Sequence, residues 1–213
     1  MKEALQGSLS AQEVMQSRHA VRRYVPGVSI PQADLQEILE LAAAAPSSWN
    51  LQHWRFLVVT EQENKKRLLP IAFNQQQVAD CSAVIIVLGD LEANRSAEAV
   101  YRPMLESGAM SQRAYDTLLG NIAGAYAGGP EGPRDEANRN AALAAMQLML
   151  AAKAKGYDTC PMGGFDRVKI RQELNIPDRF LPVMMITLGK AAAPAHETSR
   201  FPLEQLVVWE KFF

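Results

Sequence analysis

Four short segments of this chain concentrate side chains that can bind an anion or the polar edge of a planar ring. The first, from Ser17 to Tyr24, carries Arg18 and Arg22 four residues apart. Two guanidinium groups at this spacing can converge on one phosphate and form bidentate contacts with it. The second segment, Ala45 to Trp54, contains two serines, an asparagine, a glutamine and two tryptophans. Amides donate and accept together, which suits the alternating edge of a heterocycle, and indoles can stack on its face.

The other two segments lie toward the C-terminus. Cys160 to Phe165 contains Gly163 and Gly164 after a predicted strand, and glycine lets the backbone approach a flat ligand closely. Gly189-Lys190 together with Arg200 adds positive charge for a phosphate. The first three segments also have ordinary explanations: solvated surface arginines, a polar loop that satisfies its own backbone, and a plain strand-to-helix turn, respectively.

Several other site classes lack their central residues. The histidines His19, His53 and His196 lie far apart and show no metal-ligand spacing, and Cys81 and Cys160 form no CxxC pair. The chain has no GxSxG elbow, no Walker A loop and no strand-linked GxGxxG. The sequence therefore gives no support to zinc, hydrolase, P-loop or Rossmann sites, and we interpret both cysteines as reduced core residues.

The elements that must position these segments follow from hydrophobic periodicity. A capping box at Ser10 to Glu13 predicts a short first helix. Aliphatic runs predict strands, and apolar residues at helical spacing predict helices. The expected strands are 55–60, 82–88, 159–162 and 181–189; the expected helices are 31–45, 61–71, 138–155 and 166–174, with an irregular helical stretch over 95–126 and a break at 128–133. Strict strand–helix alternation is missing, so we expect an α+β fold.

The predicted helix 138–155 is apolar on nearly every face. Such a helix has to be buried all round, which a second subunit would provide; the alternative is the central helix of a monomer. The segment 203–213 carries leucine, valine, tryptophan and phenylalanine, so we expect it to dock on its own body or on a partner.

Composition restricts the class of protein. The 213 residues are 48% hydrophobic, which supports one domain over 1–213, with a helical excursion or lid at about 95–133 and a C-terminal arm at 203–213. The net charge of −1 argues against nucleic-acid binding and against a polybasic membrane patch. The N-terminus has no apolar signal-peptide core, and the longest aliphatic runs are far below the roughly 20 residues of a membrane span. We expect a soluble, cytoplasmic protein.

Taken together and in this order, the segments resemble the nitroreductase family of FMN enzymes over essentially the whole chain. SRHAVRRY is similar to the family's phosphate motif, and PSSWNLQHW to its PSSxNxQPW loop. The resemblance implies a central, mostly antiparallel sheet surrounded by helices, and an intertwined homodimer with FMN at the interface. It further implies ping-pong transfer of hydride from NADH or NADPH, through the flavin N5, to small aromatic acceptors such as nitroaromatics or quinones. The cofactor then performs the chemistry, so no side chain is nominated as catalytic acid or base.

The resemblance also assigns cofactor contacts. Pro46, Ser47, Ser48 and Asn50 would reach in from the other subunit, and Gly163 and Gly164 would line the ring near N5. The full set of implied cofactor-binding residues is Arg18, His19, Ala20, Arg22, Pro46, Ser47, Ser48, Asn50, Gln52, Asn74, Gln77, Pro161, Met162, Gly163, Gly164, Lys190 and Arg200.

Three residues depart from the family pattern. Ala20 replaces a serine and removes one phosphate hydroxyl, His53 replaces the proline before Trp54, and Gln77 occupies a place often held by lysine. Without that lysine the reduced anionic flavin should be less stabilised. The open alternatives are another flavin chemistry on the same scaffold (reductive dehalogenation, substrate dehydrogenation or flavin breakdown), a non-catalytic flavin-binding dimer, and a monomeric helical protein whose arginines are merely surface.

Overall fold

The structure is a computed structural model that describes residues 9–212. Residues 1–8, on which most of the signal-peptide interpretation depends, and Phe213, the last residue of the predicted arm, lie outside the described residues. The helices are α1 (Ala11–Ser17), α2 (Gln32–Ala43), α3 (Gln62–Ile71), α4 (Gln77–Asp80), α5 (Ala97–Glu106), α6 (Gln112–Ala127), α7 (Glu131–Ala154), α8 (Arg167–Glu173) and α9 (Leu203–Leu206), with short 3-10 helices η1 (Ser48–Asn50) and η2 (Ala93–Ser96).

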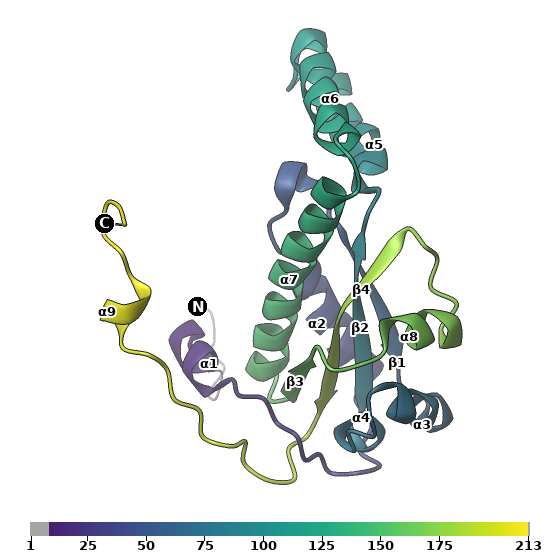
Figure 1. Cartoon of the computed structure of the whole chain (residues 1–213), viewed down its shortest axis with the longest axis vertical. Helices are drawn as coiled ribbons and strands as arrows, with labels where there is room; N and C mark the ends of the chain where they lie inside the picture. Colours follow the sequence, from purple (N-terminus) through teal and green to yellow (C-terminus); the bar gives the residue numbers. More distant parts are fainter. Residues whose placement is uncertain (1–8, 213) are drawn as a thin grey trace, which may run out of the picture.

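Four strands form one antiparallel sheet at the centre of the molecule (Figure 1). They are β1 (Trp54–Val59), β2 (Ala83–Asp90), β3 (Asp158–Met162) and β4 (Phe180–Gly189), in the order β1-β2-β4-β3. Every neighbouring pair is antiparallel. The prediction of an α+β fold with a mostly antiparallel sheet is confirmed.

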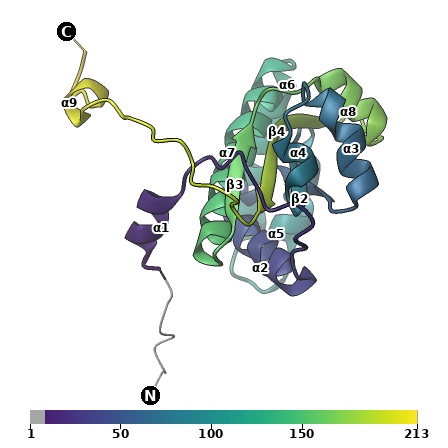
Figure 2. The same ribbon diagram turned by 90° about the horizontal axis from the view of Figure 1, so that it is seen from below.

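The central strand β2 explains why the sheet is covered on both faces. Its residues are buried throughout, and alternate side chains of a strand point to opposite faces. Ile85 and Val87 pack with α2 and α7, whereas Val84 and Ile86 pack with α3, α4 and α8. Figure 2 shows the two helical layers on either side of the strands. A strand between two helical layers needs apolar residues on both faces, which accounts for the continuous aliphatic run.

Helix α7 is the longest helix of the described chain, and it is buried on one side only. Ala141, Ala144 and Leu148 lie in the core between α2 and the sheet. On the other side Leu143 and Met146 are 44% and 41% exposed. Gly156 follows the helix with a left-handed φ of 74°, as predicted for its end. A single chain therefore leaves part of this apolar helix uncovered.

Two parts of the chain stand away from the sheet. The hairpin of α5 and α6 projects beyond one end of the sheet, and the C-terminal segment with α9 extends away from the body (Figures 1 and 2). The side chains of Leu203, Leu206, Trp209 and Phe212 are 62–84% exposed. The described arm thus does not dock on its own body, which was one of the two predicted arrangements.

Two details of the predicted elements were wrong. The break at 128–133 is shorter than expected, because α7 already begins at Glu131 and contains Pro133 in its first turn. Proline fits there, since first-turn amides have no partner within the helix. The short helix α4, which starts at Gln77, was not predicted. By contrast, the capping box is present, with the Ser10 hydroxyl accepting from the Glu13 amide.

Candidate functional site

Residues 18–22 run beside the beginning of β3. Ala20 and Thr159 form a parallel bridge, and the Val21 amide donates to the Thr159 carbonyl oxygen over 3.0 Å. Arg18 ends α1, since its amide donates to the Val14 carbonyl. This pairing brings the first predicted segment next to the third, although the two are far apart in sequence.

The two arginines flank the residue that is paired with β3. Ala20 lies between them in sequence and bridges Thr159. Burial raises the pKa of the Cys160 thiol in β3, and the charges of Arg22 and Arg18 partly offset this effect. Convergence of Arg18 and Arg22 on one phosphate stays a prediction.

One of these arginines is incompletely satisfied. The Nε of Arg18 is buried and has no hydrogen-bond partner among residues 9–212, and the same holds for the Oγ1 of Thr159. Leaving a buried donor unpaired costs about 1–3 kcal/mol, and more for a charged group. A phosphate would supply both an acceptor and a countercharge. The junction of 18–22 with β3 therefore fits the phosphate of a mononucleotide. Nearby, the side chain of His19 is exposed and that of Ala20 is half-buried.

The glycines after β3 face open space. A Cβ placed on Gly163 would meet no atom of the described chain within 4 Å, and one on Gly164 would meet only the Gln75 amide nitrogen, at 3.5 Å. Met162 is buried, and Pro161 is half-buried. The backbone of 163–164 is thus uncovered in the single chain, which fits the close approach of a flat ring.

The segment 74–77 is tied to these glycines by amide hydrogen bonds. The Gln75 amide donates to the Gly164 carbonyl over 2.9 Å, and the Gln77 amide lies 3.8 Å from the Met162 sulfur. Gln77 is buried, whereas Asn74 is exposed and adopts a left-handed φ of 56°. The structure therefore brings both predicted ring-edge residues into the neighbourhood of the glycine turn.

The loop 46–52 has an unusual backbone. Trp49, Asn50 and Gln52 have φ angles of 49°, 50° and 51°, a region that bulky residues rarely adopt. The Gln52 amide donates to the Ser47 hydroxyl over 3.0 Å, and the Ser48 amide donates to the Asn140 side-chain oxygen over 2.8 Å. Pro46 and Asn50 are exposed. A strained, exposed loop held by buried partners is typical of a binding site.

This loop lies far from the phosphate junction within one chain. Ser48 is bound at Asn140 of α7, while the amide of Tyr157, just before β3, donates to Ala152 near the other end of the helix. Asn140 and Ala152 are separated by about 18 Å along the axis, at the 1.5 Å rise per residue of an α-helix. One chain therefore gathers the arginines, the glycines and 74–77, but not the loop 46–52.

Lys190 and Arg200 occupy two different surroundings. The Lys190 amine donates to the Gly156 carbonyl over 2.6 Å and lies 3.9 Å from the centre of the Tyr157 ring. Arg200 is exposed on the segment between β4 and α9, where it donates to the carbonyl of its neighbour Ser199. A phosphate contact from either residue stays a prediction.

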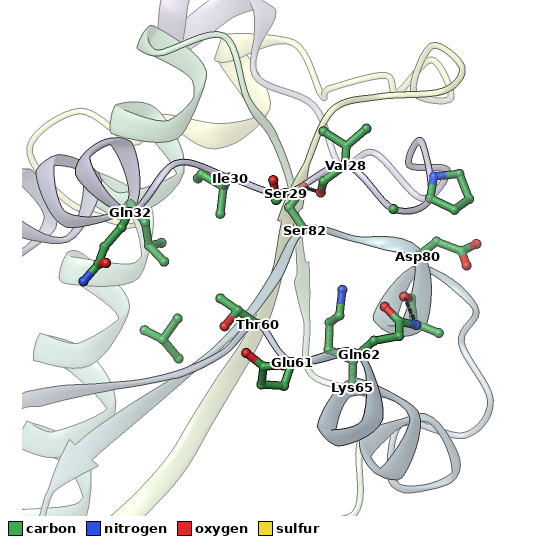
Figure 3. A pocket seen from close by; sticks show the side chains of 15 residues that line it. Val28, Ser29, Ile30, Gln32, Thr60, Glu61, Gln62, Lys65, Asp80 and Ser82 are labelled. Carbon is green, nitrogen blue, oxygen red and sulfur yellow. Dashed lines mark hydrogen bonds between the residues drawn. The ribbon is translucent and has the colours of Figure 1, made fainter.

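A separate hollow of about 990 Å³ lies at the β1 side of the sheet (Figure 3). Lys65, Glu61 and Asp80 contribute charges of both signs to its wall, and the buried Lys65 amine donates to the Cys81 carbonyl. Burial raises the pKa of the Cys81 thiol to about 11. None of the predicted cofactor-binding residues lines this hollow.

Residues 9–212 contain neither a membrane-spanning helix nor a cluster of metal-binding side chains. No helix among them is both long and apolar enough to cross a membrane, and no group of three histidine, cysteine or carboxylate side chains could hold a metal ion.

Sequence reasoning missed two groups of polar side chains behind the loop 46–52. The buried His53 forms a hydrogen bond with Tyr126, and the buried Asn140 donates to Ser48 and Glu136. Asn140 could have been noticed as the one polar residue between the alanines of the buried face of α7. His53 was noted only as a departure from a family pattern, and nothing in the sequence connects it with Tyr126.

Comparison with known proteins identifies relatives over most of the chain. The model of the "Nitroreductase family" matches residues 15–190. YodC of Bacillus subtilis (strain 168), provisionally named an NAD(P)H nitroreductase, is 47% identical over 92% of this chain and 97% of its own. The CLA biosynthesis enone reductase of Lactiplantibacillus plantarum is 35% identical, over 89% of each chain. A solved nitroreductase-like structure from Exiguobacterium sibiricum in complex with FMN has a TM-score of 0.88 at 37% identity and covers 97% of this chain and all of its own.

Proposed function

Because this chain belongs to the nitroreductase family, we propose that it uses FMN to transfer hydride from NAD(P)H to small electron-poor acceptors, nitroaromatics and quinones first among them. It is an NAD(P)H-dependent oxidoreductase with FMN as its cofactor. The acceptor class and the ping-pong order are the parts that we add.

The proposal depends on two observations: the buried Nε of Arg18 has no hydrogen-bond partner among residues 9–212, and the backbone of Gly163 and Gly164 is uncovered. The first suits an anionic tail and the second suits a flat ring, and the chain holds them at the two ends of the same short strand, β3. A mononucleotide with a planar head has both parts.

Each group of residues has a defined task in this proposal. Arg18 and Arg22 hold the phosphate, and Gly163 and Gly164 leave room for the ring and offer main-chain amides at its edge. Gln77 and Asn74 present amides rather than charge to the polar side of the ring. When bound, FMN supplies the hydride acceptor and donor in turn, so the protein contributes binding, orientation and exclusion of water.

We further propose that the site is completed in a homodimer. Two observations support a second copy: the loop 46–52 lies about 18 Å along α7 from the phosphate junction, and Leu143 and Met146 on α7 remain exposed. The apolar arm from Leu203 to Phe212 also extends into solvent. A two-fold dimer over α7 would cover these apolar groups and bring the partner's loop to the ring.

A mixed dimer tests the shared site directly. Arg18→Ala removes the phosphate contact, and Asn50→Asp keeps a residue that tolerates the left-handed backbone but replaces amide donors with negative charge. The two variants carry different tags and are co-expressed, and the dimer with one copy of each is purified through both tags.

If each site combines Arg18 of one chain with Asn50 of the other, the mixed dimer has one native site and one doubly altered site. It should then hold about one FMN per dimer, half of the wild-type content, by two-fold symmetry. Each parent homodimer should hold much less. A mixed dimer as empty as its parents would mean that both residues serve a site within one chain, and the shared-site proposal would fail.

Reduction of an activated carbon–carbon double bond is the second candidate function. It is supported by the 35% identity to the enone reductase of Lactiplantibacillus plantarum. Enones, quinones and nitroaromatics are all electron-poor, so one flavin site can reduce each of them. Specificity constants for one member of each class, measured with NADH and with NADPH, would rank them. The first choice fails if neither nitroaromatics nor quinones turn over, and parallel lines in double-reciprocal plots are expected for the ping-pong order.

A further inference from the structure

The loop 46–52 belongs physically to the α5–α6 hairpin rather than to the sheet. Its apolar side chains, Leu51 and Trp49, pack in a cluster with Ala97 of α5 and with Ile122 and Tyr126 of α6. This cluster is distinct from the two cores that cover the faces of the sheet. Moving the hairpin would therefore move the surroundings of the loop.

Two tyrosines of the hairpin also form hydrogen bonds with this part of the chain. The Tyr101 hydroxyl of α5 donates to the Trp49 carbonyl over 2.7 Å, and the Tyr126 hydroxyl of α6 lies 2.8 Å from the Nε2 of His53. Trp49 is one of the residues with left-handed φ, so the Tyr101 bond is made at the strained position itself. Strained backbone persists only where its surroundings determine it.

His53 is the buried end of this connection. Its side chain is fully buried, and its Nδ1 has no partner among the described residues. The tautomer with its proton on Nε2 leaves only a lone pair unpaired at Nδ1, whereas the other would bury an unpaired N–H. We therefore assign the Nε2 proton as donated to the Tyr126 hydroxyl. The main-chain carbonyl of His53 accepts from the Asp90 amide, which ties the residue to β2.

We propose that His53 is a positioning residue that, through Tyr126 and together with Tyr101, couples the α5–α6 hairpin to the conformation of the loop 46–52. This deepens the proposed function, on which it rests, because that loop is the part offered to the partner's FMN. An acceptor that contacts the hairpin would thus change the conformation of the loop 46–52, and through it the surroundings of the flavin.

Hydrogen–deuterium exchange of the purified full-length protein tests the coupling without reference to turnover. Tyr101→Phe and Tyr126→Phe each remove one hydroxyl and keep the ring in its apolar cluster. We expect exchange in peptides covering 47–53 to rise about fivefold, since one lost hydrogen bond is worth roughly that factor. Peptides from β2 should not change. Tyr115→Phe is the matched control, because Tyr115 is buried on the same helix and its hydroxyl makes no hydrogen bond in the described structure.

Variants of His53 separate positioning from simple packing. His53→Gln keeps an amide donor that can reach Tyr126 and should restore wild-type exchange, whereas His53→Leu should behave like Tyr126→Phe. In steady-state assays the apparent KM for the acceptor should rise about fivefold in Tyr126→Phe while kcat changes less than twofold.

The possible results are distinguishable. Unchanged exchange at 47–53 in Tyr101→Phe, Tyr126→Phe and His53→Leu would overturn the coupling, whatever the enzyme reduces. Equal effects of His53→Gln and His53→Leu would also overturn it, since a packing role does not depend on a donor. Raised exchange in a protein that binds no FMN would leave the coupling standing and remove the proposed function instead.

Discussion

Replacing Arg18 with methionine should affect the FMN-free and FMN-bound proteins in opposite directions. Methionine has a similar length but carries no donor and no charge. The Nε of Arg18 is buried and finds no partner in the described part of the chain, so in this variant the FMN-free protein loses an unsatisfied group. Its free energy of unfolding should rise by about 1 kcal/mol, which corresponds to roughly 2–4 °C in Tm for a chain of this size.

The affinity for FMN should fall in the same variant. A hydrogen bond that involves a charged group contributes about 1.5–3 kcal/mol. At 1.4 kcal/mol for each factor of ten, the Kd for FMN should rise by roughly 10- to 150-fold. Quenching of FMN fluorescence during titration with the FMN-free protein measures the Kd, and thermal melts with and without FMN measure the stability.

Arg23→Met is the matched control. Arg23 lies in the same segment, is exposed, and its main-chain oxygen accepts from Ala192 whatever its side chain. It should change the Kd for FMN less than twofold. The reasoning is refuted if Arg18→Met leaves the Kd unchanged, or if Arg18→Met and Arg23→Met weaken binding equally, because a general loss of positive charge would then be sufficient.

Three further predictions concern residues in other parts of the chain. Gly163→Val should change the free energy of unfolding of the FMN-free protein by less than about 0.5 kcal/mol from the wild-type value, since no described atom lies within 4 Å of the new Cβ. Equilibrium dialysis should nevertheless show that this variant no longer binds FMN. Unaltered binding would mean that the flavin ring lies elsewhere. Burial holds the pKa of the folded His53 side chain below its ordinary value of 6.5. As the pH falls, His53 is therefore protonated in the unfolded chain before it is protonated in the folded protein. The stability that neutral His53 contributes is complete above about pH 6.5 and declines below it. Denaturant unfolding between pH 7 and pH 5 should therefore show a slope of up to about 1.4 kcal/mol per pH unit that is reduced in His53→Gln, and equal slopes would contradict this origin. Asp90→Ala should destabilise the protein by about 3 kcal/mol, because Asp90 is 1% exposed and accepts two hydrogen bonds of 2.7 Å from Arg179. Glu98 forms an exposed pair with Arg102, so the control Glu98→Ala should lower the free energy of unfolding by less than about 0.5 kcal/mol. Similar losses of stability in both variants would contradict the role given to burial.

The secondary structure was largely predictable because its signals are local. The capping box at Ser10, the aliphatic run of β2 and the glycine after α7 each determine an element through the nearest turns of the chain. Where prediction failed, at the start of α7, a proline was interpreted as a break although the first helical turn accepts one.

The chemistry of the candidate site was also visible in part. The spacing of Arg18 and Arg22, and the glycines at 163–164, indicated an anion and a flat ring before their arrangement in space was known. The proposed role of His53, Tyr101 and Tyr126 could not be predicted from the sequence. A hydrogen bond between α6 and a residue before β1 produces no periodic pattern of residue types.

By itself, the sequence determined the types of element, the apolar faces that had to be covered, and the residue types able to hold a phosphate, since these depend on side-chain chemistry and short spacing. Only the tertiary structure decided that 18–22 pairs with β3 and that the Nε of Arg18 has no partner among residues 9–212. It also decided that the loop 46–52 is held at Asn140, about 18 Å along α7 from Ala152. The physical reason is that contacts between distant segments depend on how whole elements pack against one another, and no local preference specifies that packing.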